Sequence, residues 1–235
     1  VAYDSVEPFT ALAAAAAVTW RVRLATMIVI GPLRSTALLA KQAASVRVIA
    51  GGRLTLGLAV GARLDDYEVA GVDHRRRGAR LSEQLAYLRG GEGHVHGIGD
   101  GFELLAGGAS GPAFARMARY TDGYAHGGGP PRAFAAAAVK ARAAWSDLGR
   151  AGQPQLWGQG YFALDDAERG ASYLRDYYAF TGGFAEKIAA GNLTSARAVK
   201  DFIRGYEAAG CDELILLPTV ADIDEVDRLA EAIAR

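Results

Sequence analysis

The 235-residue chain contains a single cysteine, Cys211. It therefore cannot form an intramolecular disulfide or a metal site built from several thiolates. The chain also has no excess of charge, because its 26 basic side chains are matched by 26 acidic ones. Broad electrostatic binding to nucleic acid or to an anionic membrane needs a basic excess, so we expect neither partner. A lone cysteine fits a reducing cytoplasm, which is the compartment that we expect.

Long hydrophobic runs are missing as well. The longest runs, such as residues 11–18, are far shorter than the roughly 20 residues that a membrane-spanning helix needs. The first residues lack the basic segment and apolar core of a secretory signal peptide. Residues 1–3 instead look like the end of a strand-to-helix loop, so we expect that part of the fold lies upstream of Val1.

Short apolar segments alternate with longer helical ones along a chain that is 51% hydrophobic. Strands are predicted at 21–30, 53–60, 102–106, 123–126, 155–164 and 213–217. Helices are predicted at 8–18, 35–49, 75–88, 112–120, 132–148, 165–190 with a break near 182–183, 194–209 and 222–234. Apolar strands separated by helices are typical of a parallel sheet covered on both faces. This number of strands fits an open doubly wound sheet, or an eight-stranded barrel with two strands upstream of Val1.

Two glycine-rich turns each join a predicted strand to a predicted helix. The first, Ala-Gly-Gly-Ala-Ser-Gly-Pro at 106–112, lets a ligand approach the backbone, and the helix that follows offers free N–H groups to a phosphate. It lacks the Gly-Lys-Ser/Thr of a Walker A motif, so it is either another kind of phosphate-binding turn or a plain tight turn. The second, at 127–131, either shapes the same pocket or is only a flexible turn.

The histidines offer one candidate for the active site. His94 and His96 form a His-x-His pair, but no carboxylate cluster accompanies them, so we expect no metal site. His126 ends a predicted strand, where barrel enzymes place their chemistry, and is a candidate catalytic residue. The chain shows no nucleophile elbow, no His-Glu-x-x-His motif and no convincing acid–base pair. An enzyme without such groups often relies on a cofactor.

Several segments together resemble the bacterial luciferase-like flavin-dependent oxidoreductase family. They are PFTALAAAAAVT, RVRLATMIVIGPLRSTALLAKQAASV, GGRLTLGLAVGARLDDYEVAGVD, RRRGARLSEQLAYLR, LLAGGASGPAFARMARYTDGY and AVKDFIRGYEAAGCDELILLP. The resemblance implies an α/β fold, the TIM (β/α)8 barrel, with residues 1–235 as a single domain. The predicted strands become the third to the eighth of the barrel. The first β-α-β of the family would then lie before Val1, and we expect that residues 1–235 alone do not close a barrel.

The resemblance also implies where a cofactor binds, at the C-terminal ends of the strands. A cis peptide bond is expected within Thr26-Met27-Ile28, beneath the ring of FMN or of the deazaflavin F420. The cofactor-binding residues implied are Thr26, Met27, Ile28, Val60, Gly61, Arg63, Gly107, Gly108, Ala109, Ser110, Gly127 and Gly128. Arg63 and residues 75–77 are basic side chains that could meet the acidic tail of F420. Ala62 stands where some F420-dependent sugar-phosphate dehydrogenases carry an acidic residue, so that reaction is not expected.

These features lead to one principal hypothesis about function. We expect a monooxygenase that uses reduced FMN and O2 on a small organic substrate, and that forms a homodimer. An F420-dependent reductase or dehydrogenase that transfers hydride is the alternative within the family. A non-catalytic flavin-binding or scaffold subunit, or an unrelated sugar-phosphate-binding barrel, are alternatives of other classes. A catalytic histidine common to several subfamilies would lie upstream of Val1.

Overall fold

The computed structural model describes residues 4–90, 101 and 103–234. It divides into two compact units, which we call unit 1 (Val1–Ala125 and Ala141–Pro154) and unit 2 (His126–Lys140 and Gln155–Arg235). Helix α6 (Pro131–Asp147) contributes residues to both units. Within the described residues, no helix is both long enough and apolar enough to cross a membrane.

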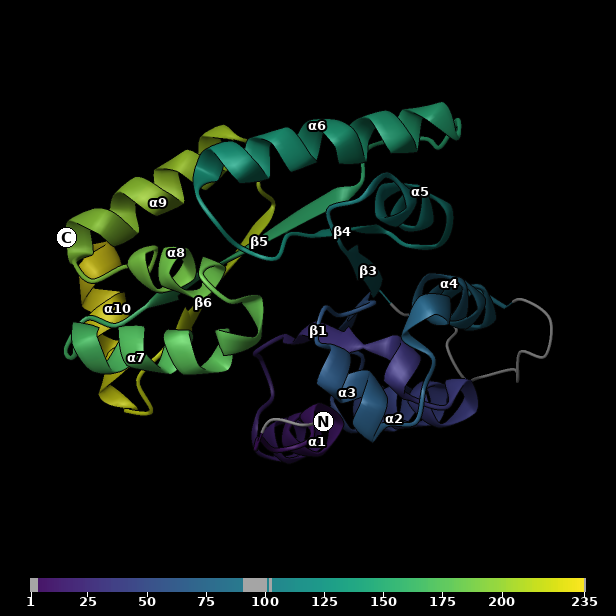
Figure 1. Ribbon diagram of the computed structural model, residues 1–235, viewed down its shortest axis with the longest axis horizontal. Helices are drawn as coiled ribbons and strands as arrows, with labels where there is room; N and C mark the ends of the chain where they lie inside the picture. The colour runs from purple at the N-terminus through teal and green to yellow at the C-terminus, as the bar shows by residue number, and fades with distance from the viewer. Residues whose placement is uncertain (1–3, 91–100, 102, 235) are drawn as a thin grey trace. The chain divides into compact units, whose positions relative to one another are not determined.

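Unit 1 contains a parallel sheet in which each strand pairs with the next one along the chain (Figure 1). Its strands are β1 (Leu24–Ile30), β2 (Leu54–Ala59), β3 (Glu103–Gly107) and β4 (Gly123–Ala125). Its helices are α1 (Pro8–Val18), η1 (Gly31–Leu33), α2 (Thr36–Ile49), α3 (Leu64–Val69), η2 (His74–Arg76), α4 (Arg77–Leu88) and α5 (Gly111–Tyr120). Every residue of β2 is buried, as a central strand covered on both faces requires.

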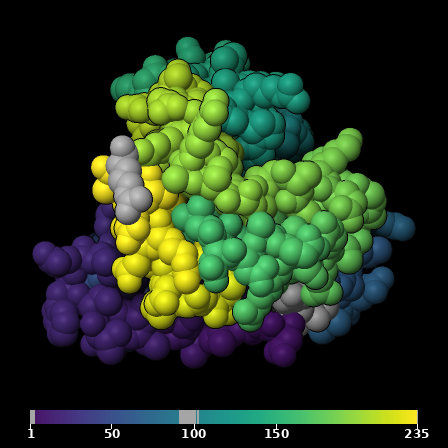
Figure 2. Space-filling view, turned by 90° about the vertical axis from the view of Figure 1, so that its left-hand side faces the viewer, coloured from purple at the N-terminus to yellow at the C-terminus, as the bar shows by residue number. Residues whose placement is uncertain are grey.

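Unit 2 contains two parallel strands, β5 (Gln155–Phe162) and β6 (Glu213–Pro218). Its helices are α7 (Ala167–Tyr177), η3 (Ala179–Thr181), α8 (Phe184–Ala190), α9 (Ala196–Ala208) and α10 (Asp224–Ala234), besides the first part of α6. Figure 2 looks onto the helical side of this unit, where α7 (green), α8 and α10 (yellow) reach the surface. Phe162, Leu193 and Val199 form a buried apolar cluster inside it.

The predicted strands and helices are confirmed, with small shifts at their ends. The first strand starts at Leu24 rather than at residue 21. The predicted helix at 165–190 breaks into α7, η3 and α8, because Gly182 adopts a φ of +61° that interrupts helical geometry. The predicted loop at 90–101 lies largely outside the described residues.

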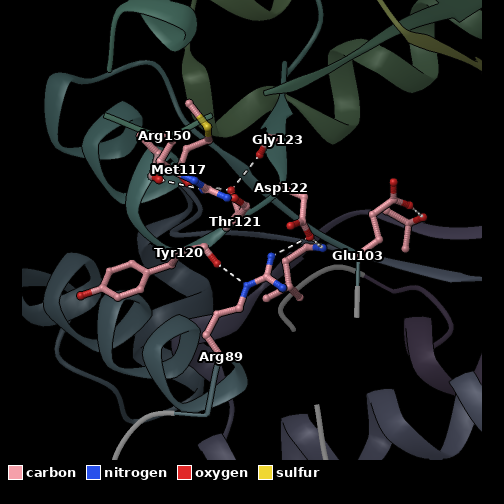
Figure 3. A network of polar contacts seen from close by, with 11 residues as sticks. Arg89, Glu103, Met117, Tyr120, Thr121, Asp122, Gly123 and Arg150 are labelled. Carbon is pink, nitrogen blue, oxygen red and sulfur yellow. Dashed lines mark hydrogen bonds and ion pairs between the residues drawn. The ribbon is translucent and has the colours of Figure 1, made fainter. Parts of the chain in front are cut away.

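An aspartate fixes the N-terminal edge of the strands in each unit. In unit 1, the Asp122 carboxylate accepts a hydrogen bond from Leu104 N at 2.8 Å, and Asp122 N donates to Leu104 O at 2.8 Å. Figure 3 shows that Arg89 joins this carboxylate, with 2.6 Å between Nη2 and Oδ2. In unit 2, Asp212 makes the same pair of bonds with Leu156, at 2.8 and 2.7 Å. These bonds hold each strand pair in register at the end opposite to the candidate site.

Candidate functional site

The end of β1 departs from a regular strand. The peptide bond between Met27 and Ile28 is cis, within the segment where the family resemblance implied such a bond. The pairing with β2 shifts register between Thr26 and Val29. There the Thr26 hydroxyl donates to Gly57 O and accepts from Gly57 N, both at 2.8 Å, so a side chain replaces main-chain pairing. Thr26 is 4% exposed, and its side chain therefore holds the backbone of β1 in place.

Ile28 lies across two glycines of the neighbouring strands. A methyl group added at Gly57 would lie 2.9 Å from Ile28 Cγ2, and one added at Gly107 would lie 3.1 Å from Ile28 Cδ1. Both separations are too close for ordinary carbon–carbon contact. The absence of side chains at these two positions therefore gives Ile28 its room, beside the carboxyl ends of β2 and β3.

The segment after β2 brings the next predicted residues to the same edge of unit 1. The buried Tyr67 hydroxyl donates to Val60 O, and burial raises the pKa of Tyr67. Gly61 has a φ of +70°, which favours glycine. Arg63 forms an ion pair with Asp65 at 2.8 Å, and its hydrogen bond lowers the pKa of the Asp65 carboxyl. Val60 and Gly61 thus lie on an ordered connection that begins where β2 ends.

The turn after β3 presents backbone donors to solvent. Gly108 has a φ of +130°, and a methyl group there would lie 2.7 Å from Ala113 Cβ, so glycine is required. Ala109 and Ser110 are exposed, and Ser110 is the N-cap of α5 without a side-chain capping bond. Within the described part of the chain, the N–H groups of residues 108–111 have no acceptor. These donors lie at the positive end of the α5 dipole, an arrangement that suits an anion.

The remaining predicted residues belong to unit 2. His126 N donates to Trp157 O at 2.8 Å, and its ring packs edge-on against Phe134 at 5.6 Å. Burial lowers the pKa of His126, which favours the neutral imidazole. Gly127 O accepts a hydrogen bond from Gln159 Nε2 at 3.2 Å, and Gly128 has a φ of +91°. These residues follow β4 and contact β5 through Gln159 and Trp157.

The structure places the predicted unit 1 residues at β1, at the connection after β2 and at the turn after β3, and sequence reasoning missed several of their neighbours. Gly57 and Tyr67 were not singled out, and neither were the polar side chains of β5, Gln159 and Tyr161. The period-two pattern Trp-Gly-Gln-Gly-Tyr in β5 was an available signal, because polar residues alternate there with glycines. His94 and His96 lie outside the described residues, and in the described ones no cluster of three or more metal-ligating side chains occurs.

Comparison with known proteins identifies related chains. Residues 1–213 match the sequence profile of a family described as luciferase-like monooxygenase. An uncharacterized protein of Mycobacterium tuberculosis (strain ATCC 25618 / H37Rv) is 34% identical over 148 aligned residues, which are 54% of this chain and 49% of that protein. The chain thus spans about half the length of the curated relatives that it matches.

Solved structures share the fold at low sequence identity. An F420-dependent secondary alcohol dehydrogenase, determined in complex with an F420–acetone adduct, superposes with a TM-score of 0.81 at 15% identity, over 98% of this chain and 84% of that one. A riboflavin lyase with modified FMN and riboflavin superposes with a TM-score of 0.71 at 15% identity, over 99% of this chain and 74% of that one. The predicted fold class, α/β of the luciferase-like TIM-barrel type, is therefore confirmed.

Proposed function

Because the chain belongs to the luciferase-like monooxygenase family, we propose that it is a flavin-dependent oxidoreductase that binds reduced FMN and acts with O2 on a small organic substrate. One observation carries the cofactor assignment. The turn at residues 108–111 offers N–H groups without an acceptor in the described chain, at the start of a ten-residue helix. A phosphate ester is the part of FMN that such a turn would hold.

The residues beside this turn fit a flat ring as well as a phosphate. The bare backbones of Gly57 and Gly107 leave room for Ile28 at the bulge, beside Met27. In the proposed complex, Met27 and Ile28 support the ring, Val60 and Gly61 line it, and Gly107, Gly108, Ala109 and Ser110 bind the phosphate. Gly127 and Gly128 belong to unit 2 and stay predicted cofactor-binding residues.

A bound reduced flavin supplies a hydride or the electrons that reduce O2. The protein's own residues would bind and orient it. Within the described residues, no ionisable side chain hydrogen-bonds to residues 108–111. His126, in unit 2, is proposed to contact the substrate as a neutral imidazole. We further propose that the protein is cytoplasmic and forms a homodimer. Light scattering on the purified protein would test the homodimer.

The cofactor assignment is tested by moving a negative charge into the turn. Ser110→Asp keeps a residue that caps helices well and places a carboxylate where the phosphate is proposed to bind. We expect FMN affinity to fall at least about tenfold, with riboflavin affinity unchanged because riboflavin lacks the phosphate. Ser195→Asp, at the N-cap of α9, is the matched control. Equal loss of FMN and riboflavin binding, or no loss of either, would contradict phosphate binding at this turn.

The F420-dependent alternative is favoured by one comparison. The alcohol dehydrogenase that uses F420 superposes with a higher TM-score than the riboflavin lyase, 0.81 against 0.71. Titration of the same protein with FMN and with F420, followed by absorbance, separates the two candidates. If F420 binds more tightly than FMN and the substrate is oxidised without O2 uptake, the reaction is hydride transfer and not monooxygenation.

A further inference from the structure

The two faces of β5 have different partners. A methyl group added at Gly158 would lie 2.6 Å from Tyr206 Cδ1, and one at Gly160 would lie 2.6 Å from Phe202 Cε1. Tyr206 and Phe202 belong to α9, so this face of β5 packs against a helix. Because side chains alternate along a strand, Gln159 and Tyr161 point to the opposite face. In a TIM barrel, the face opposite the helices is the interior, and chemistry occurs at its C-terminal rim.

Gln159 has a defined orientation. Its Nε2 lies 3.2 Å from Gly127 O, and a carbonyl oxygen can only accept, so this atom is the amide nitrogen. The same Nε2 makes a longer bond of 3.5 Å to the Tyr161 hydroxyl. Gln159 is 7% exposed, so both bonds are shielded from solvent. The Tyr161 oxygen therefore receives a hydrogen bond from its own strand.

The Tyr161 hydroxyl is also paired with that of Tyr178, which follows α7. The two oxygens are 2.5 Å apart, so one phenol donates its proton to the other. If Tyr161 donates, the Tyr178 proton is left over, and if Tyr178 donates, the Tyr161 proton is left over. Within the described residues, neither hydroxyl has another acceptor. The arrangement thus ends in one phenolic O–H that the protein itself does not use.

Aromatic rings surround this donor. Tyr178 contacts Tyr161 and Tyr177 edge-on, at 6.1 and 4.9 Å between ring centroids, and lies 6.1 Å from Phe180. Phe180 is 40% exposed, so part of the aromatic surface is open to solvent. No charged side chain hydrogen-bonds to the Tyr161–Tyr178 pair in the described part of the chain. The surface therefore combines planar apolar area with a neutral donor.

We propose that the Tyr161–Tyr178 pair, oriented by Gln159, is the specificity-determining site for an uncharged aromatic carbonyl compound, whose oxygen accepts the remaining phenolic proton. The aromatic surface of Tyr177, Tyr178 and Phe180 would receive the ring of that compound. The assignment of this compound as substrate rests on the proposed flavin-dependent function. The donor site itself rests only on the hydrogen bonds and ring contacts of unit 2.

The test compares two probes of similar shape on the full chain, without flavin. Acetophenone carries a carbonyl oxygen, and ethylbenzene has a methylene group in its place. We expect acetophenone to bind the wild-type protein about tenfold more tightly, as measured by NMR titration, because only it accepts a hydrogen bond. The double variant Tyr161→Phe/Tyr178→Phe should abolish this preference and leave ethylbenzene affinity unchanged, whereas each single variant retains one phenolic O–H and should keep a preference. Tyr173→Phe, in the same aromatic cluster but outside the hydroxyl pair, should keep it.

Equal affinity of wild-type protein for the two probes would overturn the proposal, and so would an unchanged preference in the double variant. The wild-type comparison needs no substitution, so it decides the matter even where a variant folds poorly. FMN titration of the same samples separates the two claims. Loss of FMN binding with a retained carbonyl preference would contradict the proposed function alone, and the reverse result would contradict this site alone.

Discussion

At the scale of single residues, the bulge in β1 depends on Thr26 and Gly57. The Thr26 hydroxyl occupies both hydrogen-bonding groups of Gly57, so the two strands remain joined where their main-chain pairing shifts. The segment Leu-Ala-Thr-Met-Ile-Val-Ile is otherwise an ordinary apolar strand in composition. Its own residues therefore gave no sign of a cis bond, and only the family resemblance located it. A partner 31 positions away in sequence cannot be found from local periodicity.

Buried tyrosines make the free energy of unfolding depend on pH in the alkaline range. Burial raises the pKa of Tyr161 and Tyr178, and for Tyr178 the neighbouring Tyr161 adds to the effect. Burial also raises the pKa of Tyr124 to about 12. Unfolded tyrosines ionise near pH 10, so above that pH the unfolded chain releases protons that the folded chain retains. Stability from these groups is complete below about pH 10 and is lost as the pH rises toward their folded pKa values.

We therefore expect the free energy of unfolding, measured with urea, to fall between about pH 10 and pH 12. Tyr161→Phe should make this fall shallower, because it removes one titrating group and lowers the pKa of Tyr178. A slope that is the same in Tyr161→Phe and wild type would contradict this account.

At the scale of elements, sequence reasoning worked where the signal was local. Gly51 and Gly52 marked the end of α2, and the proline-containing turn at 106–112 marked the start of α5. Strand β5 shows the limit of reasoning from sequence. Its apolar character predicted a strand, but the contacts that give Gln159 and Tyr161 their roles come from Gly127 and from Tyr178 beyond α7. Those contacts depend on how helices fold back onto strands, which composition does not specify.

The paired aspartates provide a prediction at this scale. Asp122→Ala removes the acceptor of Leu104 N and the carboxylate that Arg89 contacts. We expect it to destabilise the protein by about 1–3 kcal/mol in urea, since a backbone donor and a guanidinium lose their partner. Asp212→Ala, which removes the equivalent acceptor of Leu156 N, should cost a similar amount. The control is Asp147→Ala, at the exposed end of α6. An effect of Asp122→Ala no larger than that of this control would show that the Asp122 contacts are not stabilising.

At the scale of the whole molecule, the candidate cofactor residues are divided between the two units. The residues of the bulge and of the phosphate turn belong to unit 1, whereas His126, Gly127 and Gly128 belong to unit 2. The neutral net charge adds no general attraction for an anionic cofactor. Affinity for a phosphate must then come from local donors, and the N–H groups at 108–111 are those that the structure offers.

A cofactor that binds only the folded chain must also raise its stability. At a free FMN concentration 100 times the dissociation constant, the expected gain is about 2.7 kcal/mol, which a urea titration resolves readily. Ser110→Asp should reduce this gain because it weakens phosphate binding, whereas Ser195→Asp should preserve it. Both substitutions place the same charge at a helix N-cap, so a difference between them reports on the turn after β3 and not on helix capping. If saturating F420 stabilises the chain and FMN does not, the deazaflavin is the cofactor. If neither raises the midpoint, the flavin assignment is wrong although the fold stands.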